Sequence, residues 1–162
     1  MSDRGRLDLV LVQPGSRMEV YQRLGSTLTA IEPPVWAGLM ATFARARGYS
    51  VEIVDAEAED LAPEHVAERV AALEPTLVVV VVFGHQPSAS TQSMPAAGAI
   101  CAALKRHAPR LPSLLVGGHV SALPERTLRE EACDFVCQGE GPHTIVGLLE
   151  ALRAGEARYD HV

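Results

Sequence analysis

The sequence predicts an α/β fold in which five parallel strands form one sheet with helices on both faces. Apolar runs of strand length alternate along the chain with segments whose apolar residues recur at helical spacing. The apolar runs are unbroken, as in strands that are buried on both faces, and such strands occur in parallel sheets. Because the chain has 162 residues, of which 48% are hydrophobic, we expect residues 1–162 to form a single domain.

The first half of the chain is expected to hold two strands and two helices. LDLVLV, at 7–12, is a continuous apolar run and predicts a buried strand. After a connection rich in Gly, Ser and Thr, apolar residues recur at helical spacing over 33–48, between a double proline and a closing glycine. VEIVDA, at 51–56, predicts the second strand. The segment 63–75, with a proline at each end, predicts the second helix.

The second half continues the alternation. TLVVVVVF, at 76–83, is the strongest strand signal, because its six β-branched residues favour extended backbone. A helical pattern follows at 96–109. The remaining elements are expected in the order strand, short helix, strand and helix, at 113–118, 124–132, 133–139 and 143–155.

Five strands that alternate with five helices predict right-handed crossovers and a doubly wound, Rossmann-like sheet with the flavodoxin-like order 2-1-3-4-5. In such sheets a ligand binds outside the carboxyl ends of the strands, so the candidate site residues are those that follow each strand. Glycines there let backbone approach a ligand closely, although glycine after a strand is also common in turns. The candidates at these ends are Gln13, Pro14, Gly84, His85, Gln86, Ser88, Ser90, Thr91, Gly117, Gly118, His119, Gly139, Glu140 and Gly141.

The charge of the chain excludes one class of partner. The formal net charge is −6, and Lys and Arg are scattered rather than clustered. A nucleic-acid-binding protein needs a concentrated basic surface to neutralise phosphates, so no nucleic-acid partner is expected.

The N-terminal segment has too few apolar residues for a signal peptide or a membrane span, so we expect a cytoplasmic protein without a membrane partner.

Familiar nucleotide sites lack their motifs. No GxGxxG follows the first strand and no GxxxxGK[ST] occurs, so neither phosphate cradle is formed. A phospho-receiver domain would need acidic residues where this chain has Gln13, Pro14, Gly84 and His85. A flavin remains an alternative, because PGSRMEV after the first strand could wrap a phosphate, although the loop lacks the expected density of Ser and Thr.

Two long segments together resemble a known family. EPPVWAGLMATFARARGYSVEIVDAEAEDL, at 32–61, and LLVGGHVSALPERTLREEACDFVCQGEGPHTIVGLLEAL, at 114–152, flank a strand with a loop that carries Ser and Thr. They are similar to the cobalamin-binding domain at the N-terminus of cobalamin-dependent radical SAM enzymes, which include methyltransferases and the anaerobic cyclase of chlorophyll biosynthesis. The resemblance covers roughly 7–153. Its most specific parts are GGH at 117–119 and DFVxxGEG at 134–141.

The resemblance implies how the strand ends would be used. Cobalamin would bind base-off, with its nucleotide tail beside the sheet and its corrin ring across the strand ends. Gly117 and Gly118 would leave a slot for the benzimidazole. Ser88, Ser90 and Thr91 would hydrogen-bond the tail or the corrin amides, or cap the following helix. Residues 139–141 would border the nucleotide, and Glu140 could accept a hydrogen bond or cap the last helix.

One departure from related modules concerns the lower ligand of cobalt. Classical cobalamin modules such as that of methionine synthase carry DxHxxG after the first strand, and its histidine ligates cobalt, whereas this chain has QPGSRM at 13–18. No metal-ligating residue is therefore expected, with His85 as a weak candidate for a cobalt ligand and a corrin hydrogen bond as its more natural role. The connection 13–32 is expected to cover the ring or to meet a catalytic domain. Trp36 is expected to be a packing residue, with ligand contact left open.

The cysteines do not form an iron–sulfur motif. Cys133 and Cys137 make a CxxxC with no CxxC after it, and we expect both on one face of a buried strand. S-adenosylmethionine and a 4Fe-4S cluster would then belong to a radical SAM domain in the same chain beyond residue 162. The main hypothesis is the corrinoid-holding module of such an enzyme, for methyl transfer or a related radical reaction. A flavin-binding electron carrier and a stand-alone cobalamin carrier or sensor are the alternatives.

Overall fold

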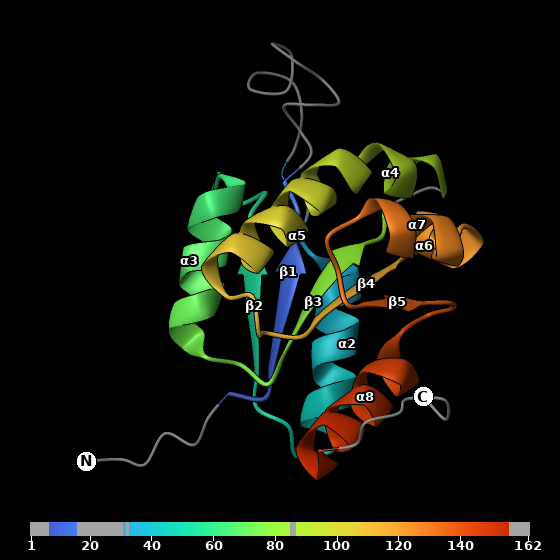
Figure 1. The fold of residues 1–162 in the computed structure, drawn as a ribbon. Coiled ribbons are helices and arrows are strands. Elements are labelled where there is room, and N and C mark those ends of the chain that lie inside the picture. Colours follow the sequence, from blue (N-terminus) through green and yellow to red (C-terminus); the bar gives the residue numbers. More distant parts are fainter. Residues whose placement is uncertain (1–6, 16–30, 32, 85–86, 156–162) are drawn as a thin grey trace.

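A computed structural model describes residues 7–15, 31, 33–84 and 87–155. Its five strands form one parallel sheet in the order β2-β1-β3-β4-β5, so the predicted fold class and strand order are confirmed (Figure 1). The strands are β1 (Leu9–Gln13), β2 (Val51–Asp55), β3 (Leu77–Val82), β4 (Ser113–Gly117) and β5 (Phe135–Cys137).

Seven helices occur among the described residues, two more than the sequence predicted. They are α2 (Val35–Arg45), α3 (Pro63–Leu73), α4 (Pro87–Gln92), α5 (Met94–His107), α6 (Gly118–Ala122), α7 (Pro124–Glu130) and α8 (Pro142–Ala154). The short helices α4 and α6 were not predicted. Their sequences, PSASTQ and GHVSA, are too short and too polar to show helical periodicity.

The strand side chains alternate between two apolar clusters, one on each face of the sheet. Val10, Val12, Val78 and Val80 pack in the cluster that α3 and α5 cover. Their sequence neighbours, among them Leu11 and Val79, pack in the cluster that α2 and α8 cover. Because neither face of the central strands is exposed, these strands are apolar throughout, which is the pattern that predicted them.

The two cysteines of the CxxxC lie on opposite faces of the sheet, so the expectation of a shared face was wrong. Cys137 is in β5 and packs against α2 and α8, whereas Cys133 packs in the cluster with α3 and α5. The alternation fails because β5 begins only at Phe135, and Cys133 therefore belongs to the preceding turn. Cys101 is buried in α5, as expected of a small core residue.

Two Asp–Ser pairs join neighbouring strands at the amino edge of the sheet. The Asp8 carboxylate accepts hydrogen bonds from the Ser50 N–H at 2.8 Å and the Ser50 hydroxyl at 2.9 Å, and Asp8 N–H donates to the same hydroxyl at 2.9 Å. Asp134 accepts in the same way from the Ser113 N–H at 2.8 Å and the Ser113 hydroxyl at 2.9 Å. Both pairs hold adjacent parallel strands in register.

Each Asp–Ser pair also binds a cation from a covering helix. Arg153 of α8 forms an ion pair with Asp8, and Lys105 of α5 donates to an Asp134 oxygen at 2.7 Å. Burial disfavours the Asp8 carboxylate, but the hydrogen bonds from Ser50 and Arg153 outweigh this effect and hold the pKa of Asp8 below its ordinary value. The carboxylates therefore tie sheet and helices together.

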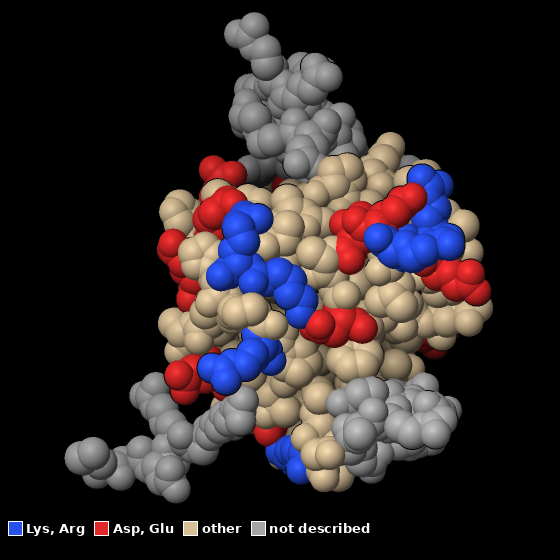
Figure 2. Space-filling view, in the orientation of Figure 1, with Lys and Arg blue, Asp and Glu red and all other residues tan. Residues whose placement is uncertain are grey.

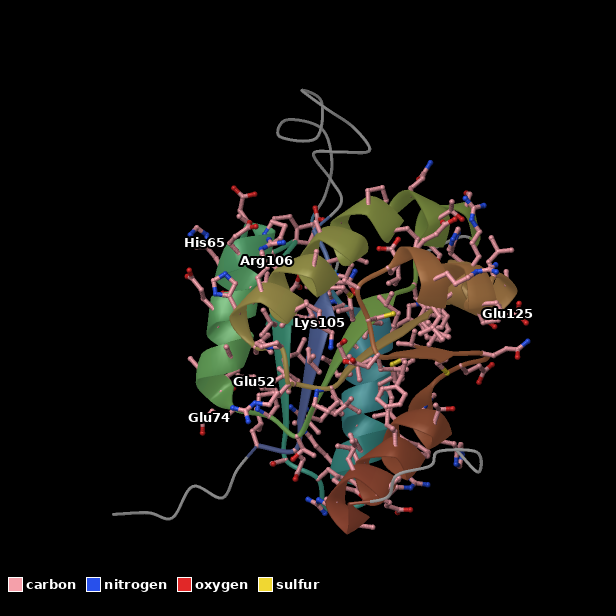
Figure 3. The ribbon with its side chains drawn as sticks, in the orientation of Figure 1. Glu52, His65, Glu74, Lys105, Arg106 and Glu125 are labelled. Atoms are coloured by element: carbon pink, nitrogen blue, oxygen red, sulfur yellow. The ribbon has the colours of Figure 1, made fainter. Side chains whose placement is uncertain are left out.

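Acidic and basic side chains are interleaved on the surface formed by α3 and α5. Figure 2 shows Lys and Arg next to Asp and Glu over this face. Arg106 pairs with Glu64 at 2.8 Å, and Arg69 pairs with Glu59 at 2.5 Å. His65 points outward from α3, on the side of the molecule away from β5 (Figure 3). No helix in the described part of the chain is long and apolar enough to cross a membrane.

Candidate functional site

The candidate site lies at the carboxyl edge of the sheet, where the strand order reverses between β1 and β3 (Figure 1). Gln13 is the last residue of β1, and its carbonyl oxygen accepts a hydrogen bond from the Ala56 N–H at 3.0 Å. Pro14 is buried. A Cβ on Gly15 would lie 3.2 Å from the Ala56 carbonyl oxygen. The chain that leaves β1 therefore starts close to the end of β2, and Gln13 and Pro14 lie on that side of the edge.

The segment after β3 turns sharply into α4. A Cβ on Gly84 would lie 2.3 Å from the Cβ of Ala89, so only glycine allows α4 to pack this closely on the strand end. His85 and Gln86 lie outside the described residues. Their roles, including that of His85 as a cobalt ligand, stay predictions.

The predicted hydroxyl residues lie on α4 rather than in a loop, and Ser90 is engaged by backbone. Ser90 is 2% exposed. Its hydroxyl donates to the Val82 carbonyl oxygen and accepts from the His119 N–H at 2.9 Å, so it joins β3, α4 and α6. Thr91 Oγ1 lies 3.0 Å from His119 Nδ1, and Ser88 is exposed. Ser88 and Thr91 are therefore better placed than Ser90 to meet a ligand.

The two glycines at the end of β4 differ in why they lack a side chain. A Cβ on Gly117 would lie 2.2 Å from the Val82 carbonyl oxygen, so packing against β3 alone requires glycine there. A Cβ on Gly118 would meet only the Ser90 side chain, at 3.6 Å, which is ordinary van der Waals contact. Gly118 is also exposed. Internal packing explains Gly117 and leaves Gly118 unexplained.

The two glycines after β5 both have left-handed backbone, and only Gly141 is also closely packed. Gly139 and Gly141 have φ values of +117° and +98°, a region that L side chains rarely adopt. A Cβ on Gly141 would lie 2.8 Å from Val116 Cγ2, whereas one on Gly139 would have no atom within 4 Å. Gly139 N–H donates to the Ser121 hydroxyl at 2.9 Å, and Glu140 is exposed. Bare, exposed backbone thus occurs at two neighbouring strand ends, at Gly118 and Gly139.

Three residues of this edge were not among the predicted site residues. Ser121 holds the Gly139 backbone, and nothing in the sequence links two positions 18 residues apart. Trp36 stacks on Phe83, with ring centroids 4.6 Å apart and 23° between the planes. Trp36 was expected to be a packing residue and does pack on Phe83, yet it is 40% exposed. Its place in the first predicted helix, two residues after the double proline, was the signal that the sequence offered.

The described residues contain no group of three His, Cys, Asp or Glu side chains that could hold a metal ion. Burial, with a smaller effect of the nearby Asp134 and Glu131 charges, raises the pKa of Cys133 to about 11. Burial also raises the pKa of Cys101 and of Cys137. All three are therefore protonated thiols at neutral pH.

A five-stranded, doubly wound parallel sheet with helices on both faces defines a domain of the α/β class. Within this class, the model of the B12 binding domain family matches residues 22–149. Since this match covers most of the chain, the chain belongs to the B12-binding domain family.

Two relatives match most of this chain. An uncharacterized methyltransferase of Pyrococcus horikoshii is 29% identical over 150 residues, which are 92% of this chain and 30% of the relative. The anaerobic magnesium-protoporphyrin IX monomethyl ester cyclase of Rubrivivax gelatinosus is 27% identical over 142 residues, which are 86% of this chain and 24% of the relative. This chain spans less than a third of the length of either.

A solved structure has the same fold. The radical S-adenosylmethionine methyltransferase TsrM from Kitasatospora setae, with cobalamin and a [4Fe-4S] cluster bound, superposes with a TM-score of 0.70 at 19% identity. The match covers 94% of this chain and 25% of TsrM. At this identity the similarity bears on the fold alone.

Proposed function

We propose that the chain binds cobalamin in the base-off form at the carboxyl edge of the sheet and presents the corrinoid to a catalytic domain. The observation that carries this proposal is the exposed backbone of Gly118, where neither packing nor a left-handed conformation requires glycine, beside the exposed backbone of Gly139. Two neighbouring strand ends without side chains can accept a long heterocyclic tail, and the family membership identifies that ligand as cobalamin.

The side chains around this backbone fit the polar parts of cobalamin. Thr91 of α4 and His119 of α6 form a hydrogen-bonded pair beside Gly118, and Ser88 lies at the start of α4. Hydroxyl and imidazole groups can donate to and accept from the amides and the phosphate of the cofactor. Glu140 follows Gly139 and can accept a hydrogen bond from a ribose hydroxyl or a corrin amide. Ser90 and Ser121 would position backbone rather than bind the ligand.

The base-off form is proposed from the resemblance to cobalamin-dependent radical SAM enzymes, and the residues after β1 bear only on the lower ligand of cobalt. The segment QPGSRM, at 13–18, contains no histidine. This loop therefore offers no imidazole as a lower ligand of cobalt. The bound cofactor would supply the chemistry of methyl transfer or of a related radical reaction. The residues of this chain would hold and orient it.

The catalytic partner is proposed to be a radical SAM domain in the same chain. The methyltransferase and the cyclase that resemble this chain are more than three times its length, so most of each lies outside the matched region. S-adenosylmethionine and a 4Fe-4S cluster would be bound there. A CxxxCxxC motif in the coding sequence beyond codon 162 would support this arrangement, and its absence would favour a stand-alone carrier or sensor.

The test is a titration of the 162-residue chain with hydroxocobalamin, followed by absorption spectroscopy after removal of the free cofactor. Saturable uptake with the spectrum of base-off cobalamin is the expected result. FMN serves as the comparison ligand. Retention of FMN and no uptake of corrinoid would refute the proposal in favour of a flavin carrier, and a base-on spectrum would refute the base-off form alone.

A further inference from the structure

A stacked aromatic pair lies at the carboxyl edge, outside the set of predicted site residues. Phe83 directly follows β3, and Trp36 is in the first turn of α2. Their ring centroids are 4.6 Å apart and their planes are nearly parallel. Phe83 follows β3, and α2 begins after the connection that leaves β1, so both residues lie at the carboxyl edge, where the pair joins sheet and helix.

The pair is held rigidly on one side and exposed on the other. Phe83 packs against the apolar cluster beneath α2 and α8, and it is followed by Gly84, on which α4 packs closely. Trp36 is 40% exposed and its neighbour Val35 is 54% exposed. A single exposed apolar side chain is ordinary, but an exposed indole stacked on the anchored Phe83 ring, with Val35 exposed in the same turn of α2, places apolar surface at the edge where the ligand is proposed to bind.

We infer that the Trp36–Phe83 stack, with Val35, is part of the cobalamin site and packs against the corrin ring. This inference rests on the proposed function. The corrin ring is broad and largely apolar, with polar amides around its rim, so a flat aromatic surface suits the ring and the hydroxyls of α4 suit the rim. Neither a phenyl ring nor an indole offers a lone pair to cobalt, so this contact adds no protein ligand to the metal.

A second copy of the chain or a catalytic domain could also cover an apolar surface on α2. The position of the stack favours the cofactor, because Trp36 and Phe83 join α2 to the end of β3, one of the two strands between which the strand order reverses. Leu39, one turn further along α2, is 56% exposed and does not share this position.

The experiment compares variants of the 162-residue chain in a hydroxocobalamin titration. Loss of the indole in Trp36→Ala is expected to raise the dissociation constant about tenfold or more, because most of a large apolar contact is removed. Trp36→Phe is expected to stay within about threefold of the original chain, since an aromatic ring still covers Phe83. Val35→Ala, which leaves the stack intact, is expected to weaken binding about twofold to fivefold.

The matched control is Leu128→Ala on α7, because Leu128 is 46% exposed, close to the exposure of Trp36. Thermal unfolding without ligand establishes that each variant is folded. Unchanged affinity in both Trp36→Ala and Val35→Ala would overturn the inference and leave the proposed function standing, as would an equal loss in the Leu128 control. No corrinoid uptake by the original chain would overturn both. Loss of dimerisation in Trp36→Ala with unchanged affinity would assign the surface to a second copy.

Discussion

The two edges of the sheet differ in how their polar groups are used: those of the amino edge are paired with one another, and those of the carboxyl edge are partly exposed backbone. At the amino edge, Asp8 and Asp134 each accept from the N–H and the hydroxyl of a serine on the neighbouring strand, and each pairs with a cation from a covering helix. At the carboxyl edge, Gly118 and Gly139 leave backbone exposed without a side chain over it.

This difference separates stability from binding. The polar groups of the amino edge are hydrogen-bonded to one another, so few remain to bind a ligand. An edge anchored in this way can hold the opposite edge in a fixed geometry. Bare backbone contributes nothing to packing, and at the carboxyl edge it leaves room for a ligand to approach. Substitutions at the amino edge should therefore change the free energy of unfolding, and those at Gly118 should change cofactor uptake.

The largest effect is expected from Gly118→Leu. A leucine would occupy the space that we assign to the cofactor tail, and uptake of hydroxocobalamin should fall by roughly 100-fold or more, equivalent to about 2.7 kcal/mol of binding free energy. Because a Cβ at this position meets only Ser90 at 3.6 Å, the chain should still fold. Near-original uptake by Gly118→Leu, measured by absorption, would show that the tail lies elsewhere.

Gly117→Ala should have the complementary effect on the neighbouring position. Its Cβ would lie 2.2 Å from the Val82 carbonyl oxygen, so either β3 or β4 must move, and the free energy of unfolding should fall by about 3 kcal/mol. Urea unfolding measures this free energy. Gly118→Ala is the matched control and should stay within about 0.5 kcal/mol of the original chain. Equal losses for the two alanines would contradict the distinction between these glycines.

Asp8→Ala should lower the free energy of unfolding by about 1–3 kcal/mol, because the Ser50 N–H and hydroxyl lose their acceptor. Asp134→Ala should lower the free energy of unfolding by less than Asp8→Ala does. The Asp134 side chain is 34% exposed, so water can replace the lost acceptor, whereas the Asp8 side chain is only 12% exposed. Cofactor affinity should be unchanged in both. A loss of affinity in Asp8→Ala without a loss of stability would mean that the two edges are not separate.

The smallest effect concerns pH. The pKa of Asp8 is lower in the folded chain than in the unfolded chain, so the carboxylate stabilises the fold above its unfolded pKa of about 4. This contribution is lost as the pH falls through that value toward the lower folded pKa. Asp8→Asn should lose less stability than the original chain between pH 6 and pH 3, as urea midpoints would reveal. Parallel pH profiles for the two proteins would exclude Asp8 as the source.

The strand ends at which the candidate site is proposed were predictable in position, but the contacts of their residues were not. The strand ends were located from the apolar runs, because a ligand site in a doubly wound sheet depends on topology alone. GG at 117–118 gave no reason to treat the two glycines differently. Their distinction depends on the Val82 carbonyl group, 35 residues earlier in the chain. The backbone partners of Ser90, at Val82 and His119, were equally invisible, and Ser90 was therefore predicted to bind the ligand.

The sequence by itself determined the five strands and the longer helices, because these follow from local apolar periodicity. The strand order was predicted as one of the common orders of doubly wound sheets and was confirmed by the structure. Only the tertiary structure decided which glycines packing requires, how Trp36 meets Phe83 and how the Asp–Ser pairs close the amino edge. Those contacts join residues 21 to 47 positions apart, and their geometry depends on how neighbouring strands and helices pack, which no local pattern encodes.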